Sequence, residues 1–173
     1  MDQNNRIVLD GQFEMVIESN DHYYIKSKYD RACIVPYTVS ADGLLSKVGI
    51  IETWNDEEKQ TSMTLLTGYL SQDDETNLVG ANRILFEITG NNIPEASKWM
   101  YLGSVYNSLT SDSPIRIYAV NVTNLEMESD VDKPELQKKF KLTDSSFVVQ
   151  SDDLLFLGAF TRLFNFFYTN SLK

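Results

Sequence analysis

The side chains of this 173-residue sequence that could do chemistry are mainly carboxylates. Aspartate and glutamate together number 25, whereas the chain has one histidine and one cysteine. A single cysteine excludes an intrachain disulfide and a thiolate metal cluster, and a single histidine excludes a multi-histidine metal site. The sequence also lacks the glycine-rich motifs that cradle phosphates or dinucleotides. Carboxylates, which ligate hard divalent cations and act as general bases, are therefore the groups to consider first.

The charge balance of the chain restricts its partners. Its 15 basic and 25 acidic residues give a net charge of −10, so the surface repels nucleic-acid phosphates and anionic lipids. The basic run Lys138, Lys139 and Lys141 is too short to reverse this balance. No stretch has the ~18 uninterrupted apolar residues of a membrane span, and the first residues do not resemble a signal peptide. We expect a soluble protein, in the cytoplasm or within an assembled virus particle, with neither nucleic acid nor membrane as a partner.

The elements that must position the carboxylates begin as strands. Asp42-Gly43 lies between two apolar runs and predicts a hairpin turn. Residues 55–60 are a polar break typical of an exposed loop. Runs rich in Val, Ile, Tyr and Phe, separated by turn residues, predict strands at 6–9, 13–18, 23–28, 32–39, 45–54, 99–106 and 115–122.

Two segments have helical spacing instead. Leu78, Ala81, Leu85 and Ile88 recur every three or four residues, and Gly90 follows where a C-cap glycine is expected. Residues 73–76 supply the acidic and capping side chains that a helix N-terminus favours. Residues 152–168 carry leucines and phenylalanines at helical spacing and predict a closing helix. Strands, a helix, further strands and a final helix predict one α+β unit built as an α/β/α sandwich.

The segment 68–91 resembles the signature of the Nudix family, G-x5-E-x7-R-E-U-x-E-E-x-G-U, where U is aliphatic. Aligned from its end, this segment places Arg83, Leu85, Glu87 and Gly90 on the arginine, an aliphatic position, a glutamate and the glycine of the signature. Glu75 falls on the upstream glutamate, and Gly68 lies one position too early. The order of the flanking elements is similar over residues 32–168, closest to the ADP-ribose pyrophosphatase branch.

This resemblance implies a fold, a domain division and an activity. The implied fold is a Nudix-like α/β/α sandwich over residues 31–173, with a mixed sheet and a C-terminal helix. Residues 1–30 resemble the extra strands with which the ADP-ribose branch dimerises. The implied activity is cleavage of ADP-ribose or a related nucleoside diphosphate with Mg²⁺ or Mn²⁺, where Glu87 is a metal ligand and Glu75, Glu126 and Glu128 complete the ligands and the general base.

The departures from the signature favour a different function. Ile84 and Ile88 stand where the family has two further glutamates. One carboxylate holds magnesium weakly, and buried isoleucines cannot offset its dehydration. We therefore expect no bound cofactor and no family-type hydrolysis. The isoleucine face would close the cleft by packing or offer a patch to a partner.

Other polar candidates have structural interpretations beside the functional ones. Arg83 and Glu87 are four residues apart and suit a surface ion pair, or an arginine that orients a glutamate. Glu126 and Glu128 follow a predicted strand, where a general base or an acidic solvated loop is expected. Glu57, Glu58, Asp73 and Asp74 suit solvated turns, His22 a structural role in a strand, and Cys33 a small buried hydrophobe.

The aromatic residues of the last helix exceed what one narrow buried stripe needs. They include Phe156, Phe160, Phe164, Phe166, Phe167 and Tyr168. Either all of them line the core, or the surplus forms a protein–protein contact, because aromatics dominate interface cores. For that contact we expect Phe160, Phe164 and Phe167, together with Ile84 and Ile88.

The sequence leaves two functions open. The first is a catalytically inactive Nudix-like domain that binds proteins or forms a homodimer or larger assembly, such as a structural component of a virus particle. The alternative is an active hydrolase of ADP-ribose-like diphosphates with a reduced metal site. Magnesium-dependent turnover separates the two.

Overall fold

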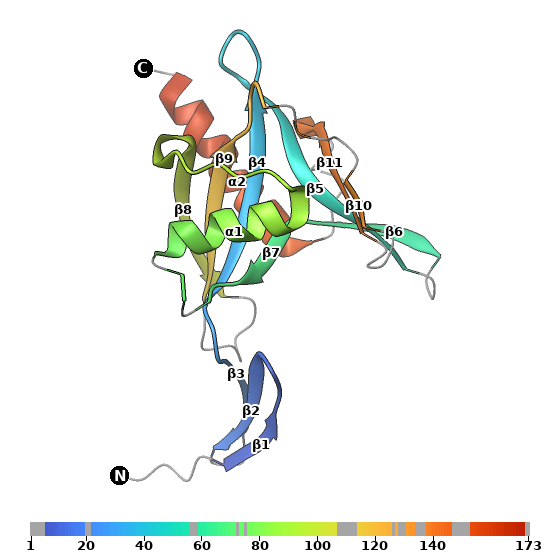
Figure 1. The fold of residues 1–173 in the computed structure, drawn as a ribbon, viewed down its shortest axis with the longest axis vertical. Coiled ribbons are helices and arrows are strands. Elements are labelled where there is room, and N and C mark those ends of the chain that lie inside the picture. The colour runs from blue at the N-terminus through green and yellow to red at the C-terminus, as the bar shows by residue number, and fades with distance from the viewer. Residues whose placement is uncertain are drawn as a thin grey trace.

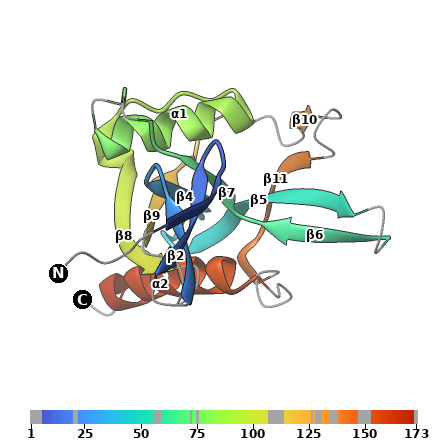
Figure 2. The same ribbon diagram turned by 90° about the horizontal axis from the view of Figure 1, so that it is seen from below.

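The computed structural model describes residues 6–19, 22–55, 59–71, 73–74, 76–106, 114–125, 127, 131–133, 138–146 and 153–171. Helices α1 (Asn77–Thr89) and α2 (Leu154–Ser171) lie on opposite faces of an eight-stranded sheet, and a separate three-stranded sheet lies near the N-terminus (Figures 1 and 2). The other elements are β1 (Arg6–Asp10), β2 (Glu14–Ser19), β3 (His22–Ser27), β4 (Arg31–Val39), β5 (Leu45–Asn55), β6 (Gln60–Thr64), β7 (Leu66–Tyr69), η1 (Ala96–Lys98), β8 (Trp99–Tyr106), β9 (Pro114–Asn121), β10 (Val131–Lys133) and β11 (Lys138–Asp144).

The large sheet is mixed. Its strands follow the order β10-β11-β5-β4-β9-β8, with β6 paired to β5 and β7 paired to β4. Strands β4 and β9 are parallel, and the other paired strands are antiparallel. Two helices packed on a mixed sheet confirm the predicted α/β/α sandwich.

Strand β4 lies between β5 and β9 in the middle of the large sheet, and both of its faces are apolar. Ala32 and Ile34 point into the core layer beneath α1, whereas Cys33 and Val35 point into the layer beneath α2. All four side chains are fully buried. A strand covered on both faces reads as a continuous apolar run in the sequence, which is why 32–39 was predictable as a strand.

Both helices begin at side chains that cap them, and α1 ends at a glycine. The hydroxyl of Thr76 accepts a hydrogen bond from the N–H of Val79 at 3.2 Å and caps α1. Gly90 has φ 74° after the last turn of α1, a conformation that glycine adopts without steric cost. The carboxylate of Asp153 accepts from the N–H groups of Leu155 and Phe156 at 2.8 and 3.2 Å, so α2 begins with an acidic cap.

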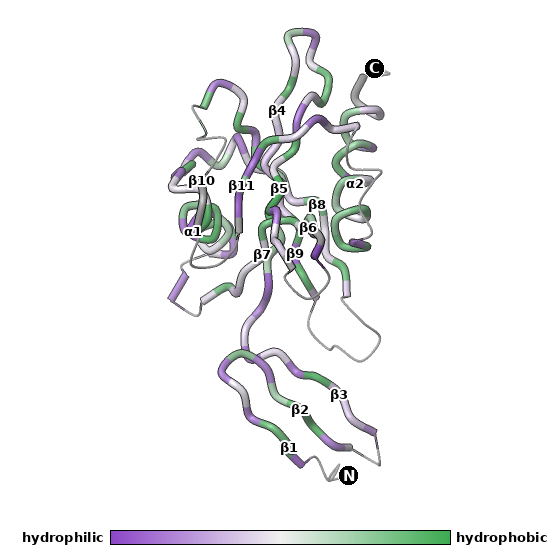
Figure 3. The backbone as a smooth tube through the Cα atoms, turned by 90° about the vertical axis from the view of Figure 1, so that its right-hand side faces the viewer, coloured by the Kyte–Doolittle hydropathy of each residue, from purple (hydrophilic) through white to green (hydrophobic). Residues whose placement is uncertain are grey.

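Strands β1, β2 and β3 form an antiparallel sheet of their own (Figure 1). Ile17 of β2 is buried, but large apolar side chains on β1 and β3 remain exposed, including Ile7, Leu9 and Ile25. Figure 3 shows hydrophobic stretches along these strands and along α2. A three-stranded sheet with so little covered surface gains little stability from its own core. Dimerisation through this sheet stays a prediction.

Four strands of the large sheet, β6, β7, β10 and β11, were not predicted. Residues 138–141 were interpreted only as a basic run, yet they lie in β11, where Phe140 is buried and Lys141 forms an ion pair with Glu52 of β5. The alternation of lysine with Phe140 and Leu142 is a strand pattern that the charge had obscured. Strands β6 and β7 escaped prediction because they are short; residues 56–58 of the predicted loop lie outside the described residues.

Candidate functional site

A pocket of about 430 Å³ lies between the N-terminal sheet, the end of β7 and the middle and last turns of α1. The turn between β1 and β2 contributes one wall, and the segment running from β7 toward α1 contributes another. Side chains of α1 form the floor. The lining residues are Gln12, Phe13, Tyr29, Gly68, Tyr69, Leu70, Ser71, Arg83 and Glu87.

Arg83 is the most heavily bonded side chain of this pocket. Its Nε and Nη2 donate to the two carboxylate oxygens of Asp74, at 3.1 and 3.0 Å. Its Nη2 also donates to the carbonyl oxygen of Tyr69 at 2.9 Å, and its Nη1 donates to Glu87 Oε1 at 2.7 Å. One guanidinium therefore bonds both described carboxylates that flank it.

Asp74 was expected to be a solvated turn charge, and the structure corrects this. Its side chain is 8% exposed, and its Oδ2 also accepts from the N–H of Ser71 at 2.7 Å. The hydrogen bonds from Arg83, the largest influence, hold the pKa of Asp74 below its usual value. The same hydrogen bonds raise the pKa of the Arg83 guanidinium. The pair stays ionised because each charge is the other's bidentate partner.

Ile84 fills the core instead of the pocket. It is 2% exposed and packs over Gly68 of β7, where an added Cβ would lie 2.9 Å from Ile84 Cγ1. Ile88 is partly buried and packs against the same core cluster. Ile84 therefore packs in the core, and the predicted interface role of Ile88 stays a prediction. A partner cannot reach Ile84 in this structure, so its predicted interface role is corrected.

The described residues do not fit a divalent cation at this site. They include no group of three or more His, Cys, Asp or Glu side chains arranged to hold a metal. Asp74 and Glu87 share Arg83, and a dication placed between them would have to displace a cation already bonded to both. Glu75, Glu126 and Glu128, the other predicted ligands, lie outside the described residues.

Aromatic rings form the side of the pocket nearest the N-terminal sheet. Phe13 stacks on Tyr69, the Arg31 guanidinium lies 5.6 Å from the centre of the Tyr69 ring, and the Tyr69 hydroxyl donates to Glu14 at 3.3 Å. Burial, and next the Glu14 charge, raise the pKa of the Tyr69 hydroxyl. The sequence analysis missed Phe13 and Tyr69, because nothing in their spacing signals a contact across 56 positions.

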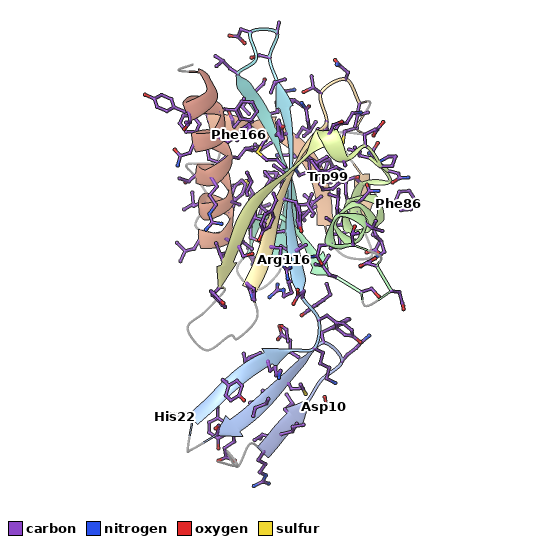
Figure 4. All side chains as sticks on the ribbon, turned by 90° about the vertical axis from the view of Figure 1, so that its left-hand side faces the viewer. Asp10, His22, Phe86, Trp99, Arg116 and Phe166 are labelled. Atoms are coloured by element: carbon purple, nitrogen blue, oxygen red, sulfur yellow. The ribbon has the colours of Figure 1, made fainter. Side chains whose placement is uncertain are left out.

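A second contact holds the segment that leads from the small sheet into β4. Arg116 of β9 donates to Asp30 from Nη2 at 2.6 Å and from Nε at 3.1 Å. Figure 4 shows Arg116 at the end of the large sheet that faces the N-terminal strands. The hydrogen bonds to Asp30 raise the pKa of the Arg116 guanidinium.

The aromatics of α2 divide between the core and the surface. Phe156 is buried, and Phe160 and Phe167 pack partly buried against the core, with the Phe167 ring 5.4 Å from that of Tyr37. Phe164, Phe166 and Tyr168 are exposed. Of the two alternatives, the one in which all of these rings line the core is therefore wrong. Their contact with a partner stays a prediction.

The remaining candidate residues that the structure describes do not line the pocket. Cys33 is fully buried in β4, as predicted, and burial raises the pKa of its thiol. His22 is exposed at the start of β3, and Asp73 is exposed as predicted. Glu57 and Glu58 lie outside the described residues. Neither described helix is long and apolar enough to cross a membrane.

Comparison with known proteins addresses the fold. No family model matches the sequence, and no curated protein is similar to it. A crystal structure of an ADP compounds hydrolase is similar to 96% of this chain and 93% of its own, with 13% identity and a TM-score of 0.61. A mutT/nudix family protein from Listeria innocua is similar over 84% of this chain and 97% of its own, with 15% identity and a TM-score of 0.60. The chain therefore has a Nudix-like fold, as its sequence predicted.

Proposed function

We propose that this Nudix-like domain functions by binding and assembly, and does not hydrolyse nucleoside diphosphates through a metal held by α1. The observation that carries the proposal is the set of bonds around Arg83. Its guanidinium already binds Glu87, which lines the pocket, and Asp74, which lies behind Arg83 outside the pocket lining. The residues that directly follow Arg83 and Glu87 in α1 are Ile84 and Ile88, which offer no oxygen ligand.

Charge explains why this arrangement opposes metal catalysis. A magnesium ion needs several oxygen ligands at about 2.0–2.1 Å and a site negative enough to offset its lost hydration. Asp74, Glu87 and Arg83 together carry a net charge of −1. Ile84, fully enclosed beside Gly68, adds no ligand. Without the ion, nothing in this group would offset the charge that develops on a cleaved diphosphate.

Exposed apolar surface supports a role in assembly. Ile7 and Leu9 of the N-terminal sheet, and Phe164 and Tyr168 of α2, are each more than half exposed. Apolar side chains gathered on single elements mark interaction surfaces more often than scattered ones do. We propose that the chain works in a homodimer or a larger protein complex.

The test is a hydrolysis assay with a matched control. Purified protein is incubated with ADP-ribose and a panel of dinucleotides in millimolar Mg²⁺ or Mn²⁺, and phosphate-containing products are followed. Wild type, Glu87→Gln and Glu95→Gln are compared; Glu95 is an exposed acid that follows α1 and lies outside the pocket. We expect no turnover by any of the three. Turnover that Glu87→Gln abolishes and Glu95→Gln retains would overturn the proposal.

That last outcome would establish the second candidate, a hydrolase of ADP-ribose or a related diphosphate. The observation that favours it is the pocket beside Arg83 and Glu87, in a fold shared with an ADP compounds hydrolase. Its metal would be held by Glu87 with Glu75, and its general base would be Glu126 or Glu128.

Two further outcomes refine the binding role. A thermal shift with ADP-ribose, with and without metal, would show whether the pocket holds a nucleotide that it does not cleave, because a ligand that binds only the folded state raises Tm.

The sequence also predicts a place in an assembled virus particle. Mass spectrometry of purified particles would check that prediction.

A further inference from the structure

The pocket beside α1 has aromatic rings on one side and a carboxylate on another. The Phe13 and Tyr29 rings line it with their centroids 6.5 Å apart and their planes at 64°, an arrangement that we call the aromatic corner. Phe13 is 40% exposed although it also stacks on Tyr69. Glu87 lines the same pocket, and its side chain is 56% exposed. Aromatic rings and an accessible carboxylate around one cavity are groups that bind an organic cation.

The aromatic side of the pocket already contacts one guanidinium of this chain. Arg31 Cζ lies 5.6 Å from the centre of the Tyr69 ring, on which Phe13 stacks. A cation at this distance is attracted by the negative face of the ring. Arg31 does not line the pocket, so its contact with Tyr69 leaves the cavity open.

The charges around the pocket disfavour an anion. Arg83 is the one cation among the described lining residues, and it already bonds Asp74 and Glu87. A bound anion would have to compete with both carboxylates for this guanidinium. The chain as a whole carries −10, which repels anions and attracts cations over longer distances. A cationic ligand is therefore the better electrostatic match.

Hydration distinguishes an organic cation from a metal ion at this site. Magnesium needs several oxygen ligands and gives up its water reluctantly, and the described residues do not supply those ligands. A guanidinium is weakly hydrated and planar, so it stacks on aromatic rings and donates in pairs to one carboxylate. A carboxylate has about four acceptor positions, so Glu87 can bond Arg83 and a ligand together.

The backbone holds the aromatic corner in place before any ligand binds. The Phe13 carbonyl accepts from the N–H of Lys28 at 2.8 Å, and the N–H of Gly11 donates to the Glu14 carbonyl at 2.9 Å. These bonds fix the turn between β1 and β2 against the end of β3. A site that is already ordered loses little conformational freedom on binding.

We propose that this pocket receives an arginine side chain of a partner protein. The guanidinium stacks in the corner formed by Phe13 and Tyr29 and donates to Glu87, and Leu70 supplies apolar contact for the methylene stem. The cavity volume of about 430 Å³ is within the range of sites that take small ligands. This inference rests on the proposed binding function and names the chemistry by which the partner is recognised.

The experiment is a titration of the full chain followed by amide NMR correlation spectra. The probe is N-acetyl-arginine methylamide. Its matched control is the citrulline analogue, which has nearly the same shape and no charge, with sodium chloride added to equal ionic strength. We expect saturable shifts at pocket residues with the arginine probe, in the millimolar range because a single side chain is a small part of an interface, and none with the citrulline probe.

Two variants each remove one of the binding groups. Glu87→Gln should weaken binding of the arginine probe about tenfold, because a hydrogen bond to a charged acceptor is lost. Phe13→Leu keeps an apolar side chain without a ring and should weaken binding about two- to fivefold. Glu95→Gln and Tyr23→Leu are the matched controls, since both residues are exposed and lie outside the pocket, and they should bind as wild type does. Circular dichroism checks that all four variants fold.

Several outcomes would overturn the proposal. These are the absence of saturable shifts with the arginine probe, equal shifts with citrulline, and unchanged binding in Glu87→Gln. Tighter binding of free L-arginine than of the blocked probe would identify a small-molecule site in place of a protein-binding one. Displacement of the probe by ADP-ribose would assign the pocket to an anionic ligand.

Failure of this inference looks different from failure of the proposed function. Metal-dependent turnover would refute the loss of hydrolysis, whatever the arginine probe does. A pocket that ignores the arginine probe would refute the recognition of arginine and leave the hydrolysis assay unchanged.

Discussion

The ring of Phe13 lies flat on the ring of Tyr69, with 4.5 Å between centroids and 8° between planes. Phe13 precedes β2 of the small sheet, and Tyr69 ends β7 of the large one. The backbone carbonyl of Tyr69 also accepts from Arg83 at 2.9 Å. Tyr69 thus contacts the N-terminal sheet with its ring and α1 with its backbone, so these two parts of the structure are joined through one residue.

Replacing Phe13 with alanine should loosen the small sheet without unfolding the large one. The lost stacking and burial correspond to about 1–2 kcal/mol, less than the cost of truncating a fully buried ring. Amide hydrogen exchange should therefore become faster in β1, β2 and β3 and stay unchanged in β4. Tyr23→Ala, an exposed aromatic of β3, is the control and should have little effect. Equal acceleration in β4 would contradict this assignment.

Gly68→Ala should destabilise the fold by about 1–3 kcal/mol, because the new methyl group overlaps Ile84 in a closed core. Urea unfolding measures the loss. Adding Ile84→Ala in the same chain should make the Gly68→Ala change less harmful, which a double-mutant cycle detects. Gly158→Ala in α2 is the control. Its methyl group meets nothing within 4 Å and should stabilise the helix by about 0.5–1 kcal/mol.

Asp74→Asn should cost about 1–2 kcal/mol at pH 7, since it removes a charged acceptor of Arg83. The pKa of Asp74 is lowered in the folded state, so its contribution is fully present above the unfolded pKa of about 3.9. It is lost as pH falls through the lower folded value. The difference in unfolding free energy between wild type and variant should therefore shrink in acid. Asp73→Asn, at an exposed neighbour, should show a much smaller difference at pH 7.

Cys33 should resist thiol reagents in the folded protein. Burial is the main cause of the raised pKa of its thiol, so the folded chain holds almost no reactive thiolate. Ellman's reagent at pH 8 should label Cys33 only after denaturant is added. Because the pKa is raised on folding, the free energy of unfolding should fall as pH rises above the unfolded thiol value of about 8.5. Rapid labelling without denaturant would contradict the burial of β4.

Much of the fold could be predicted from local patterns. Helix α1 was predictable because Leu78, Ala81 and Leu85 share one face and Gly90 follows them. Strand β8 has the predicted bounds, Trp99–Tyr106, because its turn residues and its β-forming side chains agree. Strand β11 was not predicted, since the charge of its lysines drew attention away from the alternating Phe140 and Leu142.

The candidate site was only partly predictable, because its contacts are long-range. The pairing of Arg83 with Glu87 follows from their separation of four residues on a helix. The pairing of Arg83 with Asp74 depends on how the chain turns before Thr76, and no periodic pattern records that turn. The replacement of two expected glutamates by isoleucines was visible in the sequence. Only the structure shows that Ile84 is buried against Gly68.

Arg162 has a consequence for the open side of the large sheet. Strand β8 ends the strand order, so its free backbone groups could pair with a strand from another molecule. Two of its carbonyls, those of Leu102 and Ser104, are occupied by the guanidinium of Arg162. A foreign strand would have to remove that cation before it could add to the sheet. Arg162 of α2 therefore competes with any added strand for two acceptors of β8.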